Sequence, residues 1–173
     1  RDAVDNDKLN LQDKLVVALY SAFTIRDDYG KVTLLTRRGA VPDEESNKSY
    51  YNTKDHKFYL QNYKTHNKYG NKIYQMPKQV KDIVNKIMKE DPIRKYLIEK
   101  SKGKIFGANG KLSSYIGDIF KKAGGFTQTV KVNDLRHSRV AELYSKKDTT
   151  KANKIKLASD MCHEVSTAVM IYD

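Results

Sequence analysis

Apolar residues recur at intervals of three and four along most of this 173-residue chain. This spacing persists over two or more turns in residues 8–23, 78–89, 112–122 and 132–144. It places the apolar side chains on one face of an α-helix, and that face must be buried against other elements. Shorter helices are predicted after Asp91-Pro92, between 149 and 159, and over the last residues of the chain. We therefore expect a mainly helical chain, long enough for one domain with its own core.

Strand signals are confined to the first half of the chain. Residues 32–36 read as a short strand, and residues 57–63 and 72–76 alternate apolar and polar side chains. The link between the last two is rich in lysine and turn-forming residues, which predicts a β-hairpin with a long tip. The expected fold class is α+β, mainly α-helical, with a small antiparallel sheet of about three strands.

Positive charge is concentrated in the middle of the chain. Residues 46–104 hold 15 basic and 5 acidic side chains, a net +10 out of +12 for the whole chain, interleaved with tyrosines. Such a surface favours a polyanionic partner, and we predict double-stranded DNA. A lysine-rich surface that is only solvated is the alternative.

Cysteine content and hydropathy exclude several classes of protein. The one cysteine, Cys162, rules out a disulfide framework and fits a reducing compartment inside the cell. No stretch has the apolar length of a membrane span, and no signal-peptide pattern opens the chain. Because no four-ligand Cys/His spacing occurs, we predict no Cys/His metal site.

Two arginines fall on predicted apolar helix faces. Continuing the face of Leu15 and Leu19 reaches Arg26, and Arg136 precedes Val140 by one turn, with Asn133 on the same side. An unpaired buried guanidinium is costly, so each needs a carboxylate or a bound anion as its partner. Both outcomes are open at this point.

A histidine and a tyrosine lie near the C-terminal end of the sequence. Tyr172 ends an apolar stripe at helical spacing, and His163 precedes it by nine residues. Taken alone, Tyr172 fits a core position. Together with two arginines and a hairpin lysine, however, it suits attack on a phosphodiester, since guanidiniums clamp phosphate oxygens and a lysine can protonate the leaving oxygen.

The order of these residues resembles the tyrosine recombinase (phage integrase) family. The matching segments are Phe23-Thr24-Ile25-Arg26, Tyr63-Lys64-Thr65, Asn133-Asp134-Leu135-Arg136-His137-Ser138, and Met161-Cys162-His163 followed by Tyr172. The hairpin phrase and the segment after Arg26 look most like enzymes of large DNA viruses, virophages and related mobile elements.

The resemblance implies a set of roles and a reaction that needs neither a metal nor a cofactor. Tyr172 would be the nucleophile that forms a 3′-phosphotyrosyl link, and Arg26 and Arg136 would clamp the phosphate. Lys64 would be the general acid, with Lys68 as its rival. His163 and Asn133 would add hydrogen bonds to phosphate. Further DNA contacts are expected from Lys68, Lys72, His137 and Arg139.

The chain also departs from the family pattern. Asn133 stands where the family has histidine, and Cys162 replaces a glycine. Residues 1–173 are expected to be one catalytic domain without the N-terminal DNA-clamping domain or the C-terminal docking segment. We expect a monomer in solution and a tetramer on DNA. Type IB topoisomerase activity and a catalytically inactive DNA-binding module are the alternative functions, and the compartment is wherever the target DNA lies.

Overall fold

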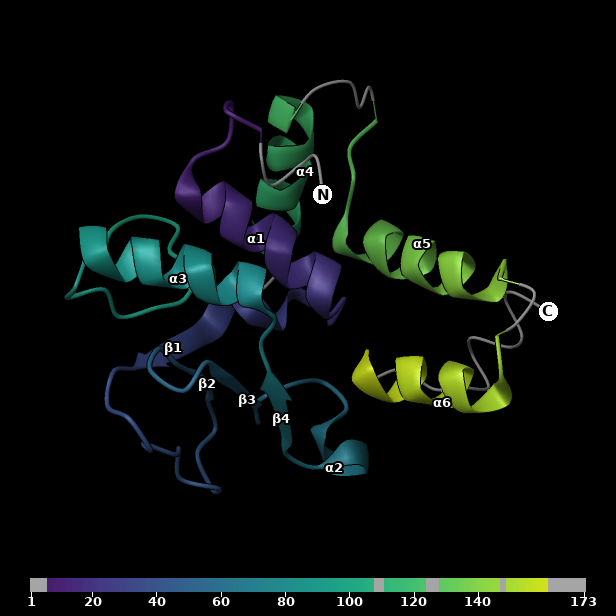
Figure 1. The fold of residues 1–173 in the computed structure, drawn as a ribbon, viewed down its shortest axis with the longest axis horizontal. Coiled ribbons are helices and arrows are strands. Elements are labelled where there is room, and N and C mark those ends of the chain that lie inside the picture. Colours follow the sequence, from purple (N-terminus) through teal and green to yellow (C-terminus); the bar gives the residue numbers. More distant parts are fainter. Residues whose placement is uncertain (1–5, 108–110, 124–127, 147–148, 162–173) are drawn as a thin grey trace.

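The computed structural model describes residues 6–107, 111–123, 128–146 and 149–161 (Figure 1). Its elements, in chain order, are α1 (Leu11–Ala22), the 3₁₀ turn η1 (Asp27–Lys31), β1 (Val32–Leu35), β2 (Ser49–Asn52), β3 (Lys57–Leu60), α2 (His66–Tyr69), β4 (Lys72–Gln75), α3 (Lys78–Glu90), α4 (Lys111–Ala123), α5 (Val132–Tyr144) and α6 (Lys151–Asp160). The predicted mainly helical α+β class is confirmed.

The sheet differs in detail from the prediction of about three antiparallel strands. It has four strands in the order β1-β2-β3-β4, and β1 pairs parallel with β2, with Val32 opposite Ser49. The β2–β3 and β3–β4 pairs are antiparallel. The β3–β4 pair is the predicted hairpin, whereas β2 was not predicted as a strand. Residues 36–48 connect β1 to β2, and a connection of that length can return the chain to a parallel start, which a tight turn cannot.

The predicted short helix after Asp91-Pro92 is wrong. In its place, the backbone runs along the edge of β1. The N–H of Leu34 donates to the carbonyl of Lys95 at 2.9 Å, and the N–H of Leu97 donates to the carbonyl of Val32 at 2.9 Å. These bonds use backbone groups that a helix would have satisfied internally, and they cover an edge that would otherwise be open to pairing.

Helix α1 is shorter than predicted. Asn10 caps it by accepting the Asp13 N–H at 2.8 Å, and Phe23 ends it in an extended conformation. Helices α3, α4 and α5 begin and end within one residue of their predicted bounds. Figure 1 shows α1 and α3 packed together over the sheet, with α5 and α6 side by side next to them.

A row of aromatic rings runs through the core and joins α1, η1 and the hairpin. Tyr20 meets Tyr29 edge-on at 5.2 Å between ring centroids, and Tyr29 meets Phe58 at 5.3 Å. Phe58 stacks on Tyr74 at 5.9 Å, and Tyr74 lies 4.7 Å from Phe23. Such pairs add to the free energy of burial. The segment from Phe23 to Tyr29 is thereby held against β3 and β4.

Two features are absent from these described ranges. None of their helices combines the length and apolar character needed to cross a bilayer. They also hold no group of three or more His, Cys, Asp or Glu side chains placed to bind a metal ion.

Candidate active site

Arg26 and Asn133 line the same cavity, which has a volume of about 160 Å³. The other lining residues are Asp27, Ser113, Lys131 and Val132. The cavity lies where η1 and α4 meet the start of α5. The N–H of Val132 donates to Ser113 Oγ at 3.2 Å, which holds the start of α5 against α4. Two segments far apart in the sequence therefore supply one polar cavity with a guanidinium and an amide.

Arg136 lies one turn after Asn133 and is buried, with 6% of its surface exposed. The start of α5 is fixed by the Asp134 carboxylate, which accepts the Lys131 N–H at 2.8 Å. Farther along the helix, Val140 packs against Met161 at the end of α6. The prediction that Arg136 lies on the inner face of α5 is confirmed.

Both arginines act on one carboxylate, that of Asp28. Burial and the neighbouring Asp27 raise the pKa of Asp28 to about 6, while Arg26, Lys31 and Arg136 oppose this rise. The two guanidiniums are thus close enough to the same half-buried group to stabilise its ionised form. Arg26 is half-buried, and the nearby Asp28 carboxylate offsets part of the cost of burying its charge.

The backbone at Arg26 is held by two tyrosines. Tyr20 donates its hydroxyl hydrogen to the Arg26 carbonyl at 3.0 Å, and Tyr29 donates to the Phe23 carbonyl at 2.9 Å. Burial, followed by the nearby Tyr29, raises the pKa of Tyr20 well above its ordinary value, which keeps this donor protonated. The prediction that Arg26 continues the apolar face of α1 is wrong, because the helix has ended and Arg26 is extended.

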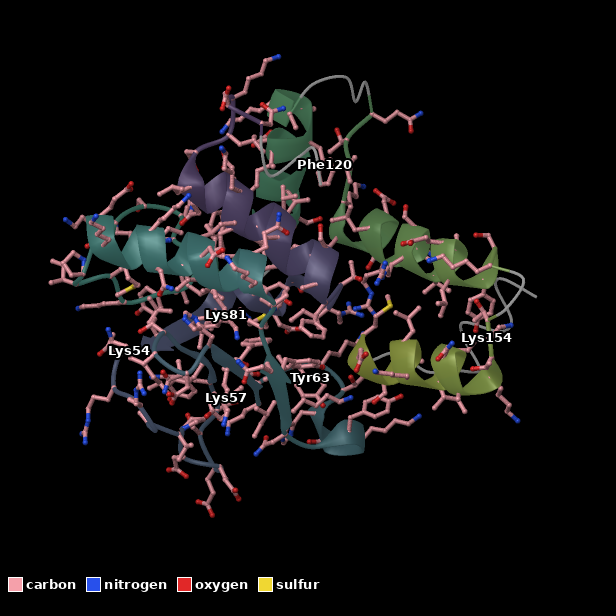
Figure 2. All side chains as sticks on the ribbon, viewed as in Figure 1. Lys54, Lys57, Tyr63, Lys81, Phe120 and Lys154 are labelled. Carbon is pink, nitrogen blue, oxygen red and sulfur yellow. The ribbon has the colours of Figure 1, made fainter. Side chains whose placement is uncertain are left out.

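Lys64 is exposed and lies in the turn between β3 and α2. Its neighbour Tyr63 is buried, donates its hydroxyl hydrogen to the Gly70 carbonyl at 2.6 Å, and meets His66 edge-on at 5.7 Å. Figure 2 shows Tyr63 beside β4, on the side of the hairpin where α6 lies. The rival lysine, Lys68, is exposed on α2 with its ammonium 5.6 Å from the Tyr69 ring centroid.

The residues predicted to contact DNA differ in their surroundings. Lys72 hydrogen-bonds to Ser159, and Arg139 forms an ion pair with Glu142 at 2.8 Å. His137 is exposed on α5. Lys72 and Arg139 are therefore already engaged within the protein. His163 and Tyr172 lie outside the described residues.

The fold is similar to that of a recombinase. A solved structure, described as the crystal structure of XerA recombinase, matches 99% of this chain with a TM-score of 0.65 and 13% sequence identity. The match covers 55% of the XerA chain, so this chain spans about half of that structure's length. No protein-family model and no curated protein matches the sequence. The fold expected from the resemblance is confirmed.

Sequence reasoning missed four residues of this region: Tyr20, Asp28, Tyr74 and Ser113. On an α-helix, a residue two positions after Arg26 would point away from it. The chain instead turns through η1 at that point. Ser113 and Tyr74 act through contacts with distant segments, and no local pattern marks such contacts. The aromatic content around Arg26 was the one available signal for Tyr20.

Proposed function

We propose that this chain cleaves and rejoins DNA strands through a covalent 3′-phosphotyrosyl intermediate, as a tyrosine recombinase does. The observation that carries the proposal is the convergence of Arg26, Asn133 and Arg136. Arg26 and Asn133 share a cavity, and Arg136 is buried one turn beyond Asn133. Two guanidiniums and an amide donor suit a phosphate with two non-bridging oxygens. The similarity in fold to XerA recombinase supports the same reading.

In the proposed reaction, the Tyr172 hydroxyl oxygen attacks the scissile phosphorus while the bond from phosphorus to the 5′ oxygen breaks. The tyrosine loses its proton, and the 5′ oxygen gains one and leaves as a hydroxyl. A tyrosine hydroxyl has an ordinary pKa of about 10, so its ionisation needs nearby positive charge. Arg26 and Arg136 would supply that charge and stabilise the phosphorane-like transition state.

The remaining roles follow from the chemistry of each side chain. Lys64 is proposed as the general acid, because a lysine on an exposed hairpin turn can reach the leaving oxygen of a bound strand. His163 would donate a hydrogen bond to a phosphate oxygen. Asn133 would donate another, although an amide cannot carry a proton at neutral pH. The phosphodiester bond energy is kept in the phosphotyrosyl link, so the 5′-hydroxyl of a second strand can reverse the reaction.

The test is incubation with a nicked duplex from which the leaving 5′ fragment diffuses away, in the presence of EDTA. We expect a protein–DNA adduct that survives denaturation and whose DNA strand is attached through its 3′ end. An absence of adduct with correctly folded, DNA-binding protein would favour the inactive DNA-binding module.

Recombination is distinguished from type IB topoisomerase activity by the products. A recombinase yields new joints between two DNA partners and is expected to act as a tetramer on DNA. A topoisomerase relaxes supercoils as a monomer. Assigning the chain to large DNA viruses, virophages or mobile elements stays a prediction.

A further inference from the structure

Strand β4 binds the C-terminal end of α6. Lys72 donates from Nζ to the carbonyl oxygen of Ser159 and, at 3.0 Å, to the Ser159 hydroxyl. Tyr74 donates its hydroxyl hydrogen to the Asp160 carbonyl at 3.1 Å. Two side chains from the same face of one strand, two residues apart, thus reach consecutive carbonyls at the end of one helix.

These contacts satisfy a general requirement of helix ends. The last carbonyls of a helix have no partner within it, and a positive charge near them also interacts favourably with the helix dipole. The cap residue Met161 follows Asp160 directly. Lys72 and Tyr74 supply partners at this end from another part of the chain and so tie the end of α6 to β4.

Tyr74 connects this helix end to the segment that carries Arg26. The Tyr74 side chain is 7% exposed, and its ring packs 4.7 Å from Phe23 and 5.9 Å from Phe58. Phe23 lies three residues before Arg26. The packing of the ring leaves little freedom for the hydroxyl, so a shift of the Arg26 segment and a shift of the end of α6 are mechanically coupled through Tyr74.

The opposite side of the same helix end rests on α5. Met161 is 1% exposed and packs with Val140, which lies one turn after Arg136. The end of α6 is therefore held between the hairpin that carries Lys64 and the helix that carries Arg136. In the sequence, His163 follows two residues after Met161.

We propose that Lys72 and Tyr74 are positioning residues for strand cleavage. They hold the end of α6 against β4, so that the segment beginning after Met161 starts from a defined point relative to Arg26, Lys64 and Arg136. Lys72 then acts through α6 and not through a DNA phosphate. This inference rests on the proposed function, because the segment that it positions carries His163 and Tyr172.

The experiment uses Lys72→Met, Tyr74→Phe, the double variant and the conservative Lys72→Arg, with Lys151→Met as the control. Lys151 is exposed at the opposite end of α6, and its substitution removes the same charge. Single-turnover cleavage of the nicked duplex is measured at saturating DNA, and the dissociation constant is measured separately. We expect the double variant to cleave on the order of tenfold more slowly or worse, since small misplacements of reacting groups cost large factors in rate.

The two readouts separate positioning from DNA contact. Lys72→Met should weaken binding no more than Lys151→Met does, and Lys72→Arg should recover most of the rate. Wild-type cleavage rates in Lys72→Met and the double variant would overturn the inference. So would a loss of affinity in Lys72→Met well beyond the control, with a full rate at saturation.

Amide hydrogen exchange tests the anchoring without any activity. Amides at the C-terminal end of α6 should exchange faster in the double variant than in the wild type, while those of α3 should not change. Unchanged exchange in α6 would overturn the inference even in an active enzyme. A wild type that shows the expected exchange but forms no adduct would instead overturn the proposed function.

Discussion

Arg26 and Asn133 face one cavity, although one follows α1 and the other lies in the first turn of α5. Their proximity depends on the packing of α4 between these segments and on the bond from Val132 to Ser113. Any DNA phosphate that enters the cavity would meet a guanidinium from one segment and an amide from the other.

Arg136→Ala should reduce the cleavage rate by a factor on the order of one hundred or more and leave the dissociation constant for DNA nearly unchanged. Losing a preorganised donor to the transition state typically costs this much. Arg136→Lys keeps the charge but loses the bidentate hydrogen bonding of the guanidinium, so it should recover only part of the cleavage rate.

Arg38→Ala is the matched control for Arg136, because Arg38 is exposed in the loop after β1. Circular dichroism melting checks that each variant folds. Normal cleavage by folded Arg136→Ala would remove this residue from the mechanism.

Lys64→Ala should cleave normal DNA slowly but recover on a substrate whose scissile 5′ oxygen is replaced by sulfur. A thiolate leaves without protonation because the ordinary pKa of a thiol is about 8.5. The same pair of substrates tests Lys68→Ala. If Lys68→Ala shows the recovery and Lys64→Ala does not, Lys68 is the general acid.

Asp28 should make stability depend on pH. Its pKa is about 6 in the folded protein against 3.8 ordinarily. Well below pH 3.8, the Asp28 carboxyl is protonated in both the folded and the unfolded protein. Between pH 3.8 and about 6, the folded protein keeps this proton and the unfolded protein has lost it. The free energy of unfolding therefore falls as pH rises, by up to roughly 3 kcal/mol from this group.

Urea unfolding of Asp28→Asn between pH 4 and 6.5 measures that contribution. The stability of the variant relative to the wild type should increase with pH over this range. Asp118→Asn, altered at an exposed position on α4, serves as the control. A constant difference between wild type and Asp28→Asn across the range would contradict the assignment.

Much of the fold follows from periodicity in the sequence, while the contacts that build the site do not. The spacing of Val80, Ile83, Val84 and Ile87 predicts α3 nearly to the residue, because apolar residues at helical spacing are enough to identify an amphipathic helix. The parallel pairing of β1 with β2 could not be predicted in this way. It depends on the path that residues 36–48 take between the two strands, and no local sequence pattern predicts that path.

In the candidate site, too, helical periodicity predicts some positions and long-range contacts determine the others. The burial of Arg136 could be predicted, since it shares a helical face with Val140. The position of Arg26 could not be predicted by the same reasoning, because no glycine or proline marks the end of α1 before Phe23. Tyr74 was missed because its partners lie on other elements, and Asp28 because the chain turns through η1 where a continued α-helix was predicted.

DNA affinity should fall steeply with salt. The motivation is the net +10 on residues 46–104, whose lysines lie at several places around the sheet, including Lys54, Lys57 and Lys81 in Figure 2. The slope of log affinity against log salt should be roughly −0.9 for each phosphate contact. Titrating the protein with duplex DNA at salt concentrations from roughly 50 to 200 mM measures this slope. An affinity that does not change with salt would contradict the prediction.

The most direct test of the proposed function compares Tyr172→Phe with Tyr144→Phe on the nicked duplex in EDTA. Each change removes one oxygen. Tyr144 follows Arg136 on α5 but has no histidine at the spacing that His163 keeps from Tyr172. We expect the wild type and Tyr144→Phe to form the denaturation-resistant adduct, and Tyr172→Phe to bind DNA and form none. An adduct formed by Tyr172→Phe would contradict both the choice of nucleophile and the mechanism built on it.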